Sequence, residues 1–163
     1  MAGHDRLTPE GIAFFKQLDE LKELQVRVGF QRGQAAESSG EGENGGTETD
    51  LCDIAAWNEL GVPSKNIPAR PFLRQTADKS GENIAKFGEQ AIRQITNGGT
   101  ADTALMQIGN YVKGQVQNEI ASGDFAPNKE ATMKRKGSET PLIDTGRMRG
   151  SVSFHICKKG EFD

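Results

Sequence analysis

The segment Asn97-Gly98-Gly99-Thr100 decides the fold, because it separates two long stretches with helical periodicity. Upstream of it, residues 72–95 place apolar side chains on one stripe of a helix. Downstream, Thr100 or Asp102 can cap a second helix, whose apolar stripe continues through residues 104–120. Two long helices joined by a short turn pack antiparallel. The sequence therefore predicts an antiparallel helix pair as the frame of the protein.

Shorter elements flank this helix pair. Thr8 can cap a helix that continues to residue 21, and residues 51–60 form another helical pattern. Residues 25–30 and 151–156 alternate between apolar and polar side chains, so each is expected to be a strand, and the two are expected to pair. The expected fold class is α+β, with a small antiparallel sheet packed against the two long antiparallel helices. Because two strands alone make a poor sheet, further strand content is expected near residues 67–70, in the long loop or from a neighbouring molecule.

The chain length fits a single domain, residues 1–163, with one hydrophobic core. Residues 31–50 form a flexible acidic loop or arm, and residues 124–150 form an extended basic connection. Six acidic residues and no basic one lie within residues 37–53, whereas residues 127–159 contain eight basic and three acidic residues. This polarity suits head-to-tail stacking in an assembly or a basic face near nucleic acid, and an unevenly charged solvated surface explains it equally well.

The acidic loop is rich in Gly and Glu. Residues 31–49 contain five glycines and no Leu, Ile, Val or Phe, so the loop cannot bury enough apolar surface to offset its chain entropy. Two interpretations stay open. The loop is either an arm that orders against a neighbouring subunit or a disordered tether.

The composition gives no indication of a cofactor, a metal or a membrane. Cys52 and Cys157 lie far apart, and neither they nor His4 and His155 show the close paired spacing of a zinc motif. No run approaches the roughly 20 apolar residues of a membrane span, and the N-terminus lacks the apolar core of a signal peptide. We expect a soluble protein with free thiols and no cofactor.

The stretch Leu142-Ile143-Asp144-Thr145-Gly146 resembles the active-site signature of a retroviral-type aspartic protease. That chemistry needs two aspartates sharing one proton, so Asp144 could serve only in a homodimer. Arg147 and Arg149 would lower the pKa of Asp144 and oppose the shared proton, and only 17 residues follow Gly146. A tight turn explains the same residues, because Asp accepts backbone N–H bonds and Gly takes positive φ. We therefore expect no enzyme.

A basic cluster makes nucleic-acid binding a further hypothesis. Its cations would face phosphates, and no aromatic residue lies between them for base stacking. Contact with DNA would be electrostatic and independent of sequence, as in the wall of a channel that DNA passes. The cations are Lys129, Lys134, Arg135, Lys136, Arg147 and Arg149.

Three motifs carry a resemblance to a known family. In chain order they are Asp53-Ile54-Ala55-Ala56-Trp57-Asn58-Glu59-Leu60-Gly61, then Ile67-Pro68-Ala69-Arg70-Pro71-Phe72-Leu73, then a tail signature of Ala126-Pro127-Asn128, Thr132, Lys134-Arg135-Lys136-Gly137 and Pro141 through Val152. Together they resemble the neck and tail-completion proteins of long-tailed bacteriophages and prophages, which join heads to tails. The resemblance covers roughly residues 25–156 without the acidic loop, which departs from the family pattern.

The resemblance implies a non-enzymatic α+β subunit of the virion, made in the host cytoplasm during assembly. It would form a homo-oligomeric ring, of sixfold symmetry, around the DNA channel in the neck or at the top of the tail. Its partners would be the tail terminator or tail tube protein on one side and the head–tail connector or stopper on the other. A tail terminator or another minor tail protein is the alternative within the virion.

Five residues are candidate contacts with a neighbouring subunit or partner. Arg70 lies between Ala69 and Pro71 on a rigid extended segment, which suits a fixed ion pair across a subunit boundary. Trp57 fits a core or interface anchor better than a ligand platform. Phe72 anchors the same segment, and simple core packing explains it as well. Arg147 and Arg149 could project toward a partner or the channel, or be solvated. The possible DNA-channel contacts are Lys134, Arg135 and Lys136.

Overall fold

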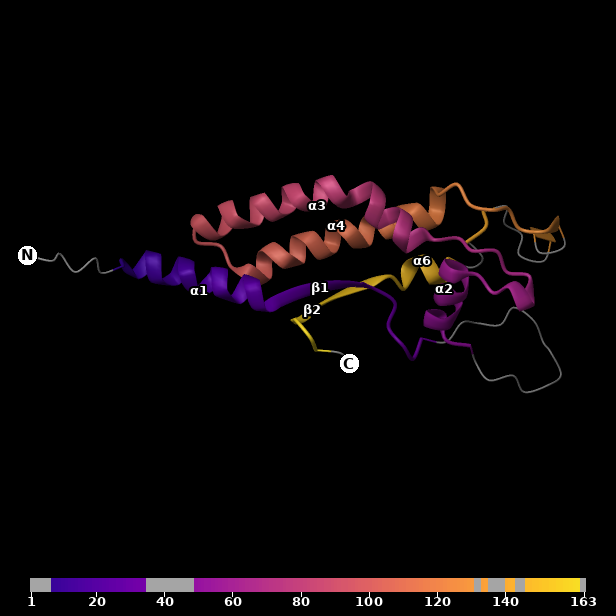
Figure 1. Cartoon of the computed structure of the whole chain (residues 1–163), viewed down its shortest axis with the longest axis horizontal. Coiled ribbons are helices and arrows are strands. Elements are labelled where there is room, and N and C mark those ends of the chain that lie inside the picture. Colours follow the sequence, from indigo (N-terminus) through magenta and orange to yellow (C-terminus); the bar gives the residue numbers. More distant parts are fainter. Residues whose placement is uncertain (1–6, 35–48, 131–132, 135–139, 143–145, 162–163) are drawn as a thin grey trace, which may run out of the picture. The chain divides into compact units, whose positions relative to one another are not determined.

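The computed structural model describes residues 7–34, 49–130, 133–134, 140–142 and 146–161. The fold class is α+β, with a small antiparallel two-stranded sheet packed against helices, as predicted (Figure 1). The elements, in chain order, are α1 (Pro9–Glu23), β1 (Leu24–Gly29), α2 (Leu51–Leu60), the 3-10 helix η1 (Pro63–Lys65), α3 (Phe72–Thr96), α4 (Ala101–Ser122), α6 (Arg147–Gly150) and β2 (Ser153–Lys158).

The helices α3 and α4 form the predicted antiparallel pair (Figure 1). Near the start of α3, the Lys79 Nζ donates to the Glu119 Oε1 at 2.6 Å. Near its end, the Gln94 Nε2 donates to the Gln107 Oε1 at 2.8 Å. The start of α3 therefore lies beside the end of α4, and the end of α3 beside the start of α4, as in an antiparallel pair. The turn residue Gly98 has a φ of 88°, which glycine adopts without strain. The helical periodicity predicts Ile84, Phe87, Ala91, Ile92 and Ile95 as the buried stripe of this helix. The prediction is wrong for Ile92, which is 42% exposed.

The strands β1 and β2 pair with each other, as the alternating patterns predicted. The Lys159 N–H donates to the Glu23 carbonyl at 2.8 Å, which places the end of β2 beside the start of β1. The expected further strand content near residues 67–70 reduces to an isolated antiparallel bridge between Val62 and Ile67 among the described residues. In the acidic loop, residues 35–48 lie outside the described part.

The predicted caps of two helices are present. The Thr8 Oγ1 accepts from the Gly11 N–H at 3.2 Å at the start of α1. At the start of α2, the Asp50 Oδ1 accepts from the Cys52 N–H at 2.9 Å, and Gly61 ends that helix with a φ of 74°.

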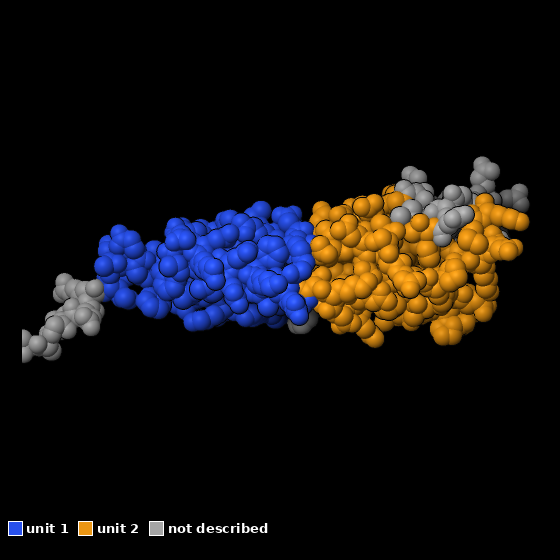
Figure 2. Space-filling model, turned by 90° about the horizontal axis from the view of Figure 1, so that it is seen from above, with its two compact units in different colours: residues 1–27, 81–111, 154–163 blue, residues 28–80, 112–153 orange. Residues whose placement is uncertain are grey.

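The contacts divide the chain into two compact units (Figure 2). Unit 1 holds residues 1–27, 81–111 and 154–163, and unit 2 holds residues 28–80 and 112–153. The single domain expected from the chain length stays a prediction. In unit 1, α1 has no buried residue, whereas the buried hydrophobic side chains of that unit are Ala91, Ile95, Ala101, Ala104, Leu105 and Cys157.

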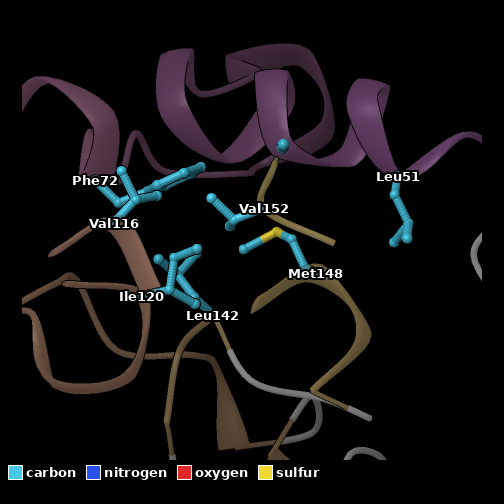
Figure 3. Packing of buried hydrophobic residues seen from close by; sticks show 8 residues of the cluster. Leu51, Phe72, Val116, Ile120, Leu142, Met148 and Val152 are labelled. Atoms are coloured by element: carbon cyan, nitrogen blue, oxygen red, sulfur yellow. The ribbon is translucent and has the colours of Figure 1, made fainter. Parts of the chain in front are cut away.

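Unit 2 contains the larger buried cluster (Figure 3). Phe72, one of its members, has no exposed surface, and its ring meets the Phe30 ring edge-on at 5.9 Å between centroids. The cluster contains side chains from α2, α3, α4, α6 and the residue before β2. Segments that are distant in sequence therefore pack against one another in one apolar cluster. Its members are Leu51, Ala55, Phe72, Val116, Ile120, Leu142, Met148 and Val152.

The basic connection, residues 124–150, is not extended throughout, which corrects the sequence prediction. Residues 147–150 form the short helix α6, because Met148 is apolar and packs into the core of unit 2. Gly146 precedes this helix with a φ of 77°, as the tight-turn interpretation of this motif expects. Asp144 and Thr145, the other residues of that motif, lie outside the described residues.

Hydrogen bonds join the two ends of the acidic loop. The Leu51 N–H donates to the Gln34 carbonyl at 2.8 Å, and the Gly33 N–H donates to the Asp50 Oδ2 at 2.6 Å. The Asp50 carboxylate thus caps α2 and closes the loop at the same time. Backbone N–H groups of Cys52 and then Gly33 hold the pKa of Asp50 below its usual range.

The contribution of Asp50 to the free energy of unfolding should depend on pH. Because the folded-state pKa of Asp50 is lowered, its stabilisation is present above the unfolded pKa of about 3.9 and is lost as the pH falls through the folded pKa. We predict that Asp50→Ala destabilises the protein at pH 7 and that this deficit shrinks below pH 4. Urea unfolding of both proteins at pH 7 and pH 2.5 measures it. A deficit that is constant with pH would contradict this role.

The packing of β2 on α4 gives a second prediction. A Cβ atom at Gly109 would overlap the ring of Phe154 on β2, whereas a Cβ at Gly114, also on α4, has no neighbour within 4 Å. We expect Gly109→Ala to destabilise the protein by about 1–3 kcal/mol through overpacking. Gly114→Ala, the matched control, should stabilise it by about 0.5–1 kcal/mol through helix propensity. Equal unfolding midpoints in urea would show that β2 does not approach α4 here.

Candidate functional site

The candidate site is built on the extended segment between η1 and α3. Pro68 and Pro71 disfavour helical backbone at the residues before them, so the chain stays extended until α3 begins. The segment lies tightly against the end of α2, since a Cβ at Gly61 would lie 2.8 Å from the Ala69 nitrogen. The Arg70 N–H donates to the Asn58 carbonyl of α2 at 2.6 Å. The backbone of residues 67–71 is therefore held before any side chain is considered.

The guanidinium of Arg70 joins three segments. Its Nη1 donates to the Asn58 Oδ1 at 3.2 Å, its Nε donates to the Ala126 carbonyl at 2.9 Å, and its Nη2 donates to the Asn128 Oδ1 at 2.9 Å. We call these four residues the Arg70 cluster. A planar guanidinium can serve three acceptors that diverge in this way, whereas a lysine ammonium lacks the fork geometry.

The acceptors of the Arg70 cluster are themselves fixed. The Asn58 Nδ2 donates to the Ile54 carbonyl within α2 at 2.8 Å, and the Asn128 Nδ2 donates to the Pro141 carbonyl at 3.2 Å. Each asparagine therefore uses its oxygen for Arg70 and its nitrogen for its own surroundings. This division assigns both amide orientations by the hydrogen bonds they make.

A neighbouring carboxylate supports the same junction. The two Glu59 oxygens accept from the backbone N–H groups of Leu73 at 2.8 Å and Arg74 at 3.1 Å, in the first turn of α3. A carboxylate at a helix N-terminus satisfies unpaired N–H groups and favours the positive end of the helix dipole. The end of α2 and the start of α3 are thereby fastened together by adjacent residues, Asn58 and Glu59.

The Arg70 side chain is a buried cation held by neutral acceptors. Arg70 is 5% exposed, and burial lowers the pKa of its guanidinium from the ordinary value. None of the ion pairs within the described residues includes Arg70. Desolvation of such a charge is costly unless its donors are satisfied, and three acceptors from two other segments, α2 and residues 126–128, meet that requirement. Arg70 therefore links the end of α2, its own segment and the chain after α4, and we call this link the staple.

Two predicted contact residues are corrected by this burial. Arg70 was expected to make an ion pair across a subunit boundary, yet its donors are turned inward to the Arg70 cluster. Phe72 has no exposed surface and belongs to the core, so the core-packing interpretation is the right one for it. Neither side chain has surface left for a partner in this fold.

Trp57 lies at the outer side of the same junction. Its ring is partly exposed, and the Lys65 Nζ of η1 stands 4.5 Å from the ring centroid, a cation–π distance. Leu60, three residues further along α2, is 71% exposed. Trp57 therefore remains a candidate for contact with a partner, in an exposed corner formed by the end of α2 and η1.

The predicted basic contacts that the structure describes, Lys134, Arg147 and Arg149, lie elsewhere in unit 2. Arg147 and Arg149 are exposed on α6, and the Gln117 Nε2 of α4 fixes this helix by donating to the Arg149 carbonyl at 3.2 Å. Lys134 is exposed as well. Arg135 and Lys136, the other possible channel contacts, lie outside the described residues. None of the hydrogen bonds given above connects these cations to the Arg70 cluster, so their roles stay predictions.

Sequence reasoning singled out Arg70 and missed the other side chains that hold this junction. Asn58, Glu59 and Asn128 all stand inside the quoted motifs, but their types alone did not show what they bind. The available signal was their position, since each lies within two residues of a helix end or a proline, where backbone groups need side-chain partners. Pairing Asn58 and Asn128 with Arg70, and Glu59 with the start of α3, required knowledge of the fold.

The site offers no evident place for a metal, because the described residues contain no group of three or more His, Cys, Asp or Glu side chains that could hold one. In the described part of the chain, no helix combines the length and apolar character needed to cross a membrane. Comparisons with protein-family models, with curated proteins and with solved structures found no match for this chain.

The Arg70 cluster predicts a large and specific loss of stability. Arg70→Met keeps much of the side-chain volume but leaves the oxygens of Asn58, Ala126 and Asn128 without their donor, so we expect a loss of about 2–4 kcal/mol in unfolding free energy. Arg74→Met, an exposed arginine one turn away, is the control and should change stability by less than about 0.5 kcal/mol. Urea denaturation measures both. Equal values for the two variants would rule out the staple.

Proposed function

We propose that this protein is a structural subunit of a tailed bacteriophage, a neck or tail-completion protein. It assembles into a ring around the DNA channel and joins the tail tube or tail terminator to the head-side connector. A closed ring of identical subunits requires a heterologous interface, in which two different surfaces of the chain meet. The proposal places the working form of the protein in the virion, after assembly in the host cytoplasm.

The Arg70 cluster is the observation that carries this proposal. The resemblance rests on three motifs that are separated by many residues, and each motif supplies one part of the cluster: Asn58 from the first, Arg70 from the second, and Ala126 with Asn128 from the third. If the three motifs matched the family by chance and independently, their residues would have no reason to bind the same guanidinium. The motifs therefore act as one structural unit, which favours reading them together.

Exposed apolar side chains give the proposal a second support. Six large hydrophobic residues in the described part of the chain are more than two-fifths exposed, and three of them lie at or just before α1. Single exposed apolar residues are common on monomers, but several on one helix with no buried residue are typical of a surface that a partner covers. The six are Leu7, Ile12, Phe15, Leu60, Ile92 and Met106.

The test is the copy number of this chain in purified phage particles. Quantitative mass spectrometry against the major tail protein should find about six or twelve copies per particle, as closed cyclic assembly requires. A non-structural protein carried over from the lysate serves as the control for contamination. Absence of the chain from finished particles would contradict the proposal.

A further inference from the structure

A groove in unit 1 is lined by residues of α1 and of the turn that joins α3 to α4. Its volume is about 690 Å³, which is within the range of pockets that bind ligands or partner side chains. Its apolar wall consists of Ala13 and Phe14 of α1 and Ile95 of α3. Its other side consists of residues 97–100 of the turn. The Gln17 Oε1 accepts from the Ala101 N–H at 2.7 Å, so α1 is hydrogen-bonded to the first residue of α4.

Two charged residues also line this groove, Glu10 and Lys16. None of the ion pairs found among the described residues includes either of them. Glu10 stands in the first turn of α1, where its own backbone N–H and then the Thr8 side chain lower its pKa, so its carboxylate is ionised at neutral pH. The helix as a whole carries four carboxylates, Glu10, Asp19, Glu20 and Glu23, and two lysines, Lys16 and Lys22.

A second exposed apolar surface lies in unit 2, at the end of α2. Leu60 is 71% exposed, the largest exposure among the six exposed hydrophobic residues, and the Trp57 ring lies on the same helix end. Lys65 stands over that ring and takes part in no ion pair among the described residues. The nearest carboxylate in sequence, Glu59, is occupied by two N–H groups of α3. We call Trp57, Leu60 and Lys65 the knob.

We propose that the knob of one copy docks into the unit 1 groove of the next copy, and that this contact builds the ring. The inference rests on the proposed function and names the interface that the function requires. The apolar wall of the groove would cover Leu60 and Trp57, and Glu10 would meet Lys65. Aromatic and aliphatic anchors inserted into pockets carry most of the binding energy in interfaces of this kind.

The chemistry favours a second copy as the occupant. A heterologous ring needs one chain to present two surfaces that differ and fit, and this chain has a groove with an apolar wall, lined by Glu10 and Lys16, and an exposed apolar surface with a cation, Lys65. A two-fold dimer would make this contact twice between the same two copies, whereas in a ring each copy offers its groove to one neighbour and its knob to the other. An acidic excess on α1 complements Lys65, which is in none of the ion pairs of the described residues.

Cross-linking between two variants that each carry one accessible cysteine tests the contact in the full chain. Ala13→Cys and Leu60→Cys are made separately in a Cys52→Ser background, and the remaining native thiol, Cys157, is buried. Mixed together with a short bismaleimide, the two proteins should form a covalent heterodimer. Ile12→Cys is the matched control, because Ile12 is equally a surface residue of α1, 59% exposed, but does not line the groove.

Charge reversal supplies a second readout that does not depend on cysteine geometry. Glu10→Lys and Lys65→Glu alone should each weaken self-association about tenfold or more in sedimentation measurements, and the double variant should recover most of the loss. Lys16→Ala should strengthen association, because Lys16 is the like charge that Lys65 would face. Circular dichroism confirms that each variant is folded before association is compared.

The outcomes separate this contact from the function. An Ala13–Leu60 cross-link with restored association in the double variant supports the contact. Equal yields from the Ile12 control, or a chain that oligomerises without either effect, overturns the contact and leaves the ring function standing. A chain that stays monomeric at all concentrations with no cross-link also overturns the contact, and the copy number in particles then decides the function independently.

Discussion

The protein depends on one buried cation. Arg70 brings the end of α2, the extended segment before α3 and the chain after α4 to a common point, and it does so with neutral acceptors only. Charge-assisted hydrogen bonds are stronger than neutral ones, and a guanidinium that has lost its water must keep all of them. The arrangement therefore specifies one geometry, because any shift of Asn58 or Asn128 would leave a buried donor unsatisfied. The apolar cluster around Phe72 adds stability to the position that Arg70 sets.

Much of this fold could be predicted from local patterns. The bounds of α2 follow from Asp50 and Gly61, and those of the helix pair from the glycines at its turn, since caps and breakers act within a few residues. The α6 helix and the partners of Arg70 could not be predicted. A four-residue helix has almost no periodicity, and Met148 forms it only because the core of unit 2 receives its side chain. The burial of Arg70 was hidden for the same reason, since arginine is a surface residue by type and only tertiary contacts reverse that tendency.

The two units differ in how they use apolar residues. Unit 2 buries a contiguous cluster, whereas the α1 helix of unit 1 has no buried residue and leaves Leu7, Ile12 and Phe15 exposed at its start. A helix with that surface gains little stability from packing against its own chain, and a partner that covers the apolar side chains would supply the missing packing. Unit 2 also leaves apolar surface uncovered, since Leu60 at the end of α2 is 71% exposed.

The central claim is that this chain forms a ring in the virion, and a focused cryo-electron microscopy reconstruction of the head–tail junction tests it most directly. The account predicts a sixfold ring of this chain around the DNA channel, with α1 of each copy against the end of α2 of the next. A junction whose density is accounted for entirely by other proteins would contradict the assignment to the neck. A ring with α1 facing solvent would retain the function and exclude the proposed contact.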